Sequence, residues 1–310
     1  MRRILFVKTS SLGDVVHHCP AVSDAARRLP GVEIDWVIEE PFAEVAAMHR
    51  AVRRVIPVAL RRWRRAPWSP AVWAELANFR KAVSVERYDA VIDSQGLLKS
   101  ALIASLASGP KHGMDRESAR EPLAARFYDV AHPVPKGMHA VERNRQLTAT
   151  ALRYALESPI DYGLQTKNSS PKDATTPYAV FLTMTSRDDK LWPDERWIDV
   201  GRNLGIDIVL PWGSEAEKAR AERIGAEIGN ATVPSRMSLL ELSNLLQKAN
   251  FAVGLDTGLT HLAAALGTRT VGLFCGSDPA LTGIYGCSRA VNVGNAGRPP
   301  AVSEVLRALA

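Results

Sequence analysis

The segment around Asp256 combines residue types that bind an anion. An apolar run over Phe251–Leu255 stops at Asp256-Thr257-Gly258, and apolar residues at helical spacing begin at Leu259. The first N–H groups of a helix have no partner within it and the helix dipole adds positive charge, so the amides of residues 257–259 could hold a phosphate. Gly258 would let that phosphate come close. The alternative is that Asp256 or Thr257 only caps the helix.

A second polar junction follows another apolar run in the same half of the chain. Thr185 and Ser186 offer hydroxyl donors, and Lys190 could neutralise the charge that grows on a departing nucleoside diphosphate. The adjacent pair Asp188-Asp189 suggests a metal site, but the basic residues on either side compete with a cation for these carboxylates. We therefore expect no metal at the site.

Two further strand-to-helix junctions supply groups that a nucleotide needs. Glu217 falls in the first turn of a predicted helix and could accept hydrogen bonds from ribose hydroxyls, or it could simply favour the helix dipole. Met237 precedes another helix and could pack on an adenine face, although a lone methionine is more often a core residue. Together the four junctions predict a donor site for a nucleotide sugar, with diphosphate, ribose and base each accounted for.

The first half of the chain has one junction of this kind, in the turn that follows its first strand. Asp14 falls at the start of the helix there, where it could act as a general base toward an acceptor hydroxyl or could serve only the helix dipole. The turn lacks the G-x-G-x-x-G and G-x-x-x-x-G-K-[ST] patterns, so nicotinamide and ATP-loop chemistry lose support.

A basic stretch with interleaved tryptophans follows in the same half. The formal net charge is +6, and Arg61, Arg62, Arg64 and Arg65 surround Trp63. Guanidinium groups bind oxyanions with two parallel hydrogen bonds, and indole favours interfaces, so this stretch suits phosphates, carboxylates or lipid headgroups. The alternative is a solvated basic face.

Short apolar runs alternate with longer amphipathic ones throughout the chain, which predicts an α/β fold. We expect strands near 3–8, 33–38, 54–58, 88–93, 178–183, 206–210, 231–233, 251–255 and 270–274. A polar stretch rich in Ser, Thr and Pro at 165–177 predicts a linker between two doubly wound, Rossmann-like domains, 1–164 and 178–310, that face a central cleft. The C-terminal helix could complete the second domain or return to the first.

Composition narrows the class of protein. No stretch approaches the roughly 18 consecutive apolar residues of a membrane span, and the N-terminus lacks the apolar run of a signal peptide, which predicts a cytoplasmic protein. The three cysteines have neither disulfide-framework nor zinc-site spacing. We see no nucleic-acid-binding motif and expect no nucleic-acid partner and no obligate protein partner.

Several segments in register resemble motifs of glycosyltransferase family 9. They are Lys8-Thr9-Ser10-Ser11-Leu12-Gly13-Asp14-Val15, the stretch 55–65, Asp89-Ala90-Val91-Ile92-Asp93-Ser94-Gln95-Gly96-Leu97, His112-Gly113-Met114-Asp115, the stretch 119–124, and Asp256-Thr257-Gly258-Leu259-Thr260-His261-Leu262. The resemblance covers nearly the whole chain and implies a GT-B fold. Three positions depart from the family pattern: this chain has Ser186 where threonine is expected, Arg65 where lysine is expected and Leu12 where methionine is common.

The resemblance implies a reaction and a set of site residues. The reaction is transfer of L-glycero-D-manno-heptose from the ADP-sugar to a Kdo residue of Kdo-substituted lipid A, with inversion and without cofactor, by an enzyme peripheral on the cytoplasmic face of the inner membrane. Asp14 and Lys190 would be catalytic. The donor residues would be Thr185, Ser186, Glu217, Met237, Asp256, Thr257, Gly258 and His261. The acceptor residues would be Arg61, Arg62, Arg64, Arg65, Arg120 and His139.

Two other functions compete with this expectation. One is a family 9 transferase that adds heptose to an already heptosylated core, against which the Arg-Arg-Trp-Arg-Arg segment argues. The other, of a different class, is a polyanion-binding protein that uses the basic stretch, which would leave the strand-end residues unexplained.

Overall fold

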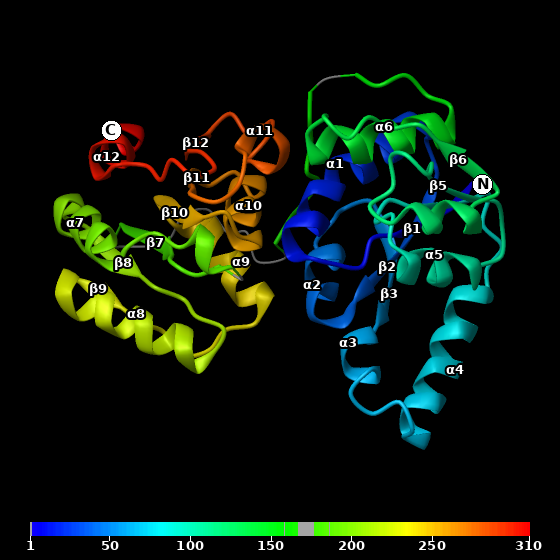
Figure 1. The fold of residues 1–310 in the computed structure, drawn as a ribbon, viewed down its shortest axis with the longest axis horizontal. Helices are drawn as coiled ribbons and strands as arrows, with labels where there is room; N and C mark the ends of the chain where they lie inside the picture. Colours follow the sequence, from blue (N-terminus) through cyan, green and yellow to red (C-terminus); the bar gives the residue numbers. More distant parts are fainter. Residues whose placement is uncertain (1, 158, 167–176, 186) are drawn as a thin grey trace. The chain divides into compact units, whose positions relative to one another are not determined.

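The computed structural model describes residues 2–157, 159–166, 177–185 and 187–310. Most of the predicted linker, and Ser186 of the predicted donor site, lie outside the described residues. The chain divides into two compact units, 1–164 and 165–310. Each unit is a six-stranded parallel sheet with helices on both faces (Figure 1). No helix of the described part is long and apolar enough to cross a membrane.

The first unit contains β1 (Arg3–Val7), α1 (Leu12–Arg28), β2 (Glu33–Glu39), η1 (Glu40–Phe42), α2 (Ala43–Ala47), β3 (Val52–Val58), α3 (Leu60–Trp63), α4 (Pro70–Ser84), β4 (Ala90–Asp93), α5 (Leu98–Ser105), β5 (Lys111–Met114), η2 (Pro122–Phe127), β6 (Val130–His132) and α6 (Ala140–Leu152). The second unit contains β7 (Tyr178–Leu182), η3 (Asp188–Lys190), α7 (Asp194–Leu204), β8 (Asp207–Val209), α8 (Glu215–Ile228), β9 (Ala231–Thr232), α9 (Leu239–Lys248), β10 (Phe251–Leu255), α10 (Gly258–Ala265), β11 (Arg269–Phe274), α11 (Pro279–Thr282), β12 (Ala290–Gly294) and α12 (Val302–Leu309).

Both sheets have the same topology. The strand orders are β3-β2-β1-β4-β5-β6 and β12-β11-β10-β7-β8-β9, which are the same Rossmann order when strands are counted within each unit. The order reverses direction between β1 and β4 in the first sheet and between β7 and β10 in the second. Ligands of such sheets bind at the carboxyl ends of the strands at this switch point, so each unit has one favoured place for a site.

The predicted α/β fold with two Rossmann-like sheets is confirmed, and the central strands account for that success. β1, β4 and β10 are apolar runs buried on both faces, as parallel strands covered by helices require. The prediction did not include β5, β6 and β12. β5 carries lysine, histidine and glycine, and β6 has only three residues.

The C-terminal helix α12 belongs to the second unit. It packs against α7, β11 and β12, and Val305 and Leu309 lie in the same apolar core as Trp192 and Trp197.

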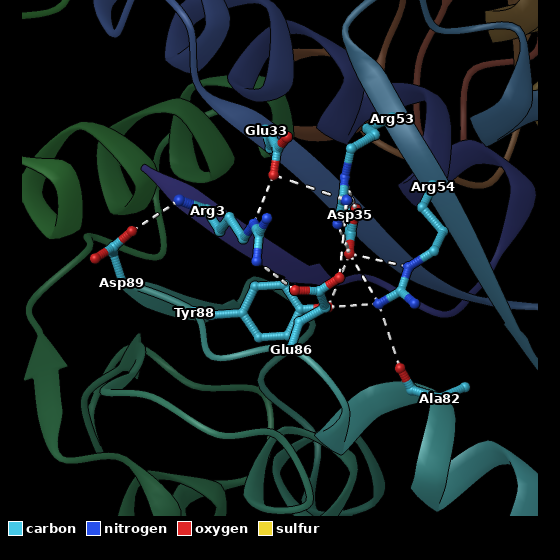
Figure 2. Close-up of polar contacts among 9 residues, drawn as sticks. All are labelled: Arg3, Glu33, Asp35, Arg53, Arg54, Ala82, Glu86, Tyr88 and Asp89. Carbon is cyan, nitrogen blue, oxygen red and sulfur yellow. Dashed lines mark hydrogen bonds and ion pairs between the residues drawn. The ribbon is translucent and has the colours of Figure 1, made fainter. Parts of the chain in front are cut away.

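A buried carboxylate ties together strands of the first sheet, as Figure 2 shows. Asp35 of β2 is fully buried and accepts hydrogen bonds from Arg53, Arg54 and the Tyr88 hydroxyl, at 2.8 to 3.0 Å. Both arginines reach it because the β2–β3 register shifts there: Asp35 pairs with Arg54, and Arg53 is the extra residue of a bulge. The cluster therefore fixes β3 and the segment before β4 on β2.

Candidate active site

The second unit gathers charged side chains around Asp256, just beyond the end of β10. The Asp256 carboxylate accepts from Lys190 Nζ at 2.6 Å and from Ser277 Oγ at 2.5 Å through Oδ2, while Oδ1 lies 3.2 Å from His261 Nε2. Its backbone oxygen accepts from Thr185 Oγ1 at 3.3 Å. Four of the predicted donor-site or catalytic residues thus meet at the switch point of the sheet.

These partners determine the charge of the carboxyl. Burial by itself would raise the pKa of Asp256, but the hydrogen bonds from His261, Lys190 and Ser277 outweigh it and hold that pKa below its usual range. Asp256 is therefore an anion that positions Lys190. The capping alternative for Asp256 does not hold, because the N-cap residue of α10 is Thr257, whose side chain makes no capping hydrogen bond.

A glycine on the strand brings the start of α10 close to the sheet. A Cβ on Gly254 would lie 2.1 Å from Thr260 Oγ1, which donates to the Leu255 carbonyl at 2.6 Å. Only glycine allows the helix to turn back so tightly. The N–H groups of Gly258 and Leu259 consequently stand at the helix start beside Asp256, where the helix has no acceptor for them.

A second close approach holds the Lys190 segment in place. A Cβ on Gly276 would lie 2.6 Å from the Asp189 carbonyl oxygen, so η3 packs directly on the loop that follows β11. Arg187 pairs with Asp189 at 2.9 Å, as expected, whereas Lys190 pairs with Asp256 and with neither neighbouring carboxylate. Among the described residues, no group of three or more His, Cys, Asp or Glu side chains could hold a metal ion.

Ser277 is a residue of this cluster that sequence reasoning missed. It follows β11, the strand next to β10, so the rule that singled out Asp256 applies to it equally. Its signal was weak because a single serine between Gly276 and Asp278 does not stand out as a binding residue.

Glu217 and Met237 lie at the same sheet edge but outside the Asp256 cluster. Glu217 Oε2 accepts from the N–H groups of Gly213 at 2.6 Å and Ser214 at 3.2 Å, which is a capping box at the start of α8. Within the described chain, Oε1 has no hydrogen-bond partner. Met237 is half-buried in the loop before α9. Trp212 Nε1 donates to the Pro234 carbonyl at 2.7 Å, so the loops after β8 and β9 are joined.

The first unit forms a different polar cluster at its own switch point. Asp14, in the first turn of α1, accepts from Arg120 Nη2 at 2.6 Å and from the Ser11 N–H at 3.1 Å. Asp14 thus caps its helix and also pairs with Arg120. These residues line a pocket whose other members are Lys8, Ser94, Gln95, Met114, Ala140, Arg143 and Asn144.

The pocket is basic, and this sets the state of its two central groups. Burial alone would raise the pKa of Asp14, but Lys8 and Arg120 lower it to about 2, so this carboxyl is ionised at neutral pH. Burial lowers the pKa of Lys8 to about 8, while nearby Asp14 partly counteracts that effect. Lys8 Nζ donates to the Ser94 carbonyl at 2.9 Å. Sequence reasoning missed Lys8 and Arg143 because neither stands out in a basic chain.

The other predicted acceptor residues have varied surroundings. Arg62 pairs with Glu40 and Glu75 at 2.8 to 3.1 Å, so it fastens α3 to its neighbours. Arg61, Arg64 and Arg65 are exposed, and the Arg61 guanidinium lies 5.5 Å from the centre of the Phe42 ring. His139 is buried and its Nδ1 accepts from the Val141 N–H as the N-cap of α6.

Each of the two Rossmann-like sheets has ionised side chains gathered at its switch point. The comparison with solved structures places this fold in the GT-B class of glycosyltransferases. The model of glycosyltransferase family 9 (heptosyltransferase) matches residues 76–307, and the chain belongs to that family.

Named relatives agree with this assignment. The chain is similar to lipopolysaccharide heptosyltransferase 1 of Pseudomonas aeruginosa, with 50% identity over 93% of this chain and 82% of that protein. The structure of E. coli heptosyltransferase WaaC with ADP matches with a TM-score of 0.92 at 44% identity, covering 99% of this chain and 98% of that one. WaaC with ADP-2-deoxy-2-fluoro heptose matches with a TM-score of 0.88 at 43% identity and the same coverage.

Proposed function

We propose that this protein transfers L-glycero-D-manno-heptose from ADP-heptose to a Kdo residue of Kdo-substituted lipid A, with inversion at the anomeric carbon. Relatives named heptosyltransferase 1, at about half identity, support this acceptor over a heptosylated core. The observation that carries the proposal is the pair of ionised clusters at the two switch points, one built around Lys190 and Asp256 and the other around Asp14.

The order of residues along the second sheet supports a donor site. Asp256, Lys190, Glu217 and Met237 follow β10, β7, β8 and β9, which are neighbours in that order. Three steps of about 4.8 Å between strands span about 14 Å, roughly the extent of a nucleoside diphosphate. Lys190 and the α10 amides then meet the diphosphate, with Thr185 and His261 beside it. Oε1 of Glu217 meets ribose hydroxyls, and Met237 packs on adenine.

The charge of the first unit's pocket supports an acidic acceptor. Lys8, Arg120 and Arg143 surround Asp14, and a carboxylate of Kdo would pair with these cations. The exposed Arg61, Arg64 and Arg65 would bind the lipid A phosphates, with Arg62 and His139 contributing to the shape of the acceptor site. The enzyme would work as a peripheral protein on the cytoplasmic face of the inner membrane, where such an acceptor is embedded.

The proposed reaction is a single displacement. The acceptor oxygen forms a bond to the anomeric carbon while the bond from that carbon to ADP breaks, and the bonding pair leaves with ADP. Lys190 stabilises the charge that develops on the diphosphate. Asp14 takes the hydroxyl proton. A carboxylate with a pKa of about 2 suffices, because the attacking oxygen becomes strongly acidic as its new bond forms.

The test is ADP release from ADP-heptose in the presence of Kdo-lipid A. We expect turnover with this acceptor, none with an acceptor that already carries the heptose, and no loss on adding a chelator. Turnover restricted to the heptosylated acceptor would replace the proposal by its nearest rival. Inactivation by the chelator would show that a metal takes part.

A further inference from the structure

Two tryptophans of the first unit project into solvent. Trp68 is 90% exposed and Trp73 is 59% exposed, whereas Trp36, Trp192 and Trp197 are fully buried. Leaving an indole in water forfeits the free energy that its burial would give, so two neighbouring exposed indoles mark a surface that is covered in use. They belong to residues 61–73, here called the tryptophan loop, which extends beyond the sheet of its unit at α3 and the start of α4 (Figure 1).

The base of this loop is fixed to the unit. Trp63 is buried in the core beside Phe79, and its Nε1 donates to Glu75 Oε2 at 2.7 Å. Arg62 pairs with Glu75 and Glu40. These contacts order the backbone at the base of the loop before binding, which removes part of the entropic cost of binding.

The exposed side chains of the loop carry one sign of charge. Arg61, Arg64 and Arg65 are exposed, and Arg80 and Lys81 are exposed on α4. Between residues 60 and 81 the only acidic residue is Glu75, and Arg62 and Trp63 already occupy it. The surface therefore combines uncompensated cations with aromatic side chains, and it complements a surface that is anionic and has an apolar interior.

We propose that the tryptophan loop docks the protein on an anionic phospholipid bilayer, with Trp68 and Trp73 in the interfacial region and the arginines on lipid phosphates. Indole is amphipathic and favours the headgroup level, and cations near an anionic leaflet add an attraction that salt screens. The docking gives the proposed transfer access to a lipid-linked acceptor. The biological role of this docking rests on the proposed function. The binding to a bilayer does not, because it needs neither donor nor acceptor.

Vesicle binding by the whole protein tests the docking directly. With phosphatidylglycerol-containing vesicles we expect salt-sensitive co-flotation, and with phosphatidylcholine vesicles little or none. The double variant Trp68→Ala, Trp73→Ala should weaken partitioning about tenfold, and Arg61→Gln with Arg64→Gln and Arg65→Gln about a hundredfold. Leu281→Ala, a change at an exposed apolar residue of the second unit, is the matched control and should leave partitioning unchanged.

Quenching by brominated lipids locates the contact. Of the seven tryptophans, only Trp68 and Trp73 are exposed, so quenching of wild-type fluorescence should disappear in their double alanine variant. Absence of vesicle binding by the wild type, or quenching that survives the double variant, would overturn the proposal. Equal binding to neutral and anionic vesicles would overturn the role of the arginines.

An activity assay separates a bilayer from a direct acceptor contact. The Trp68→Ala variant should keep its turnover on a soluble, deacylated Kdo acceptor and show a several-fold higher KM for acceptor embedded in vesicles. An equal loss on both acceptors would mean that the loop binds the acceptor's sugar, and the docking proposal would fail. An enzyme inactive on both acceptors in the wild type would refute the proposed function while leaving the vesicle result to stand.

Discussion

At the scale of single residues, the Asp14 carboxylate caps helix α1 and is also the proposed general base. Oδ2 accepts the Ser11 N–H of the capping box and Oδ1 accepts from Arg120. Asparagine at 14 would keep a carbonyl oxygen for the cap but has no carboxylate to take a proton. The substitution therefore distinguishes a helix cap from a general base.

Asp14→Asn should lower kcat on the order of 10² or more and leave the affinity for ADP-heptose unchanged. Steady-state turnover and equilibrium titration with the donor measure the two effects. Asp24→Asn is a poor control because Asp24 is bound to Arg145, so Ser84→Ala, at an exposed helix end, serves as the control. Near-normal turnover of Asp14→Asn would reduce Asp14 to a cap.

Lys8 and Asp14 predict the pH dependence of acceptor use. With a pKa of about 2, Asp14 is ionised at every pH between 6 and 10, so its titration does not change kcat/KM for the acceptor in that range. Lys8, with a pKa of about 8, is charged below that pH and neutral above it. The acceptor pocket thus loses a positive charge as the pH rises through about 8, and kcat/KM for the acceptor should fall.

The measurement is kcat/KM for the acceptor between pH 6 and 10 at saturating donor. The Lys8→Met side chain has a similar length and no proton to lose. This variant should have a lower kcat/KM for the acceptor at pH 6, and its kcat/KM should not fall as the pH rises through about 8. A fall that persists unchanged in this variant would assign it to another group.

At the scale of elements, the Asp35 cluster shows what a buried carboxylate does for the sheet. Asp35→Ala would leave Arg53, Arg54 and the Tyr88 hydroxyl without their common acceptor. Because the two guanidinium groups and the hydroxyl would remain without this acceptor, we expect the free energy of unfolding to fall by about 3 kcal/mol. Denaturant titration measures the change.

The matched control is an ion pair on the surface. Arg202 and Glu227 are both more than half exposed, so Arg202→Ala should cost less than about 1 kcal/mol. A loss at Asp35 no larger than the loss at Arg202 would show that the buried cluster contributes little.

Patterns within elements were predictable, and pairings between distant elements were not. The apolar runs of β1, β4 and β10 specify buried strands, and the strand-end rule brought Asp14, Lys190 and Asp256 to the switch points. The ion pairs Asp14–Arg120 and Lys190–Asp256 join residues 106 and 66 positions apart, and no local pattern encodes such a contact. The capping box of Glu217 is a local pattern, but the alternative expected for this residue was only a favourable interaction with the helix dipole.

The short edge elements illustrate a second limit. β6 has three residues, too few for a period to be detected, and it forms because the neighbouring β5 offers it hydrogen-bond partners. β9 has only two residues and coincides with the strand expected at 231–233. Ser277 follows the same logic, since its place beside Asp256 depends on the pairing of β10 with β11.

At the scale of the whole molecule, the two units have separate cores and separate polar clusters, so each substrate should protect its own unit. ADP should slow amide hydrogen exchange most in residues 256–262 and 187–190, because bound ligand shifts local opening toward the closed state by RT ln(1 + [L]/Kd), about 2.7 kcal/mol at a hundredfold excess over Kd. Lys190→Ala should lose this protection, and Asp14→Asn should retain it. Exchange followed by mass spectrometry with ADP alone measures both. Protection centred on residues 11–16 and 118–122 instead would reverse the assignment of donor and acceptor to the two units.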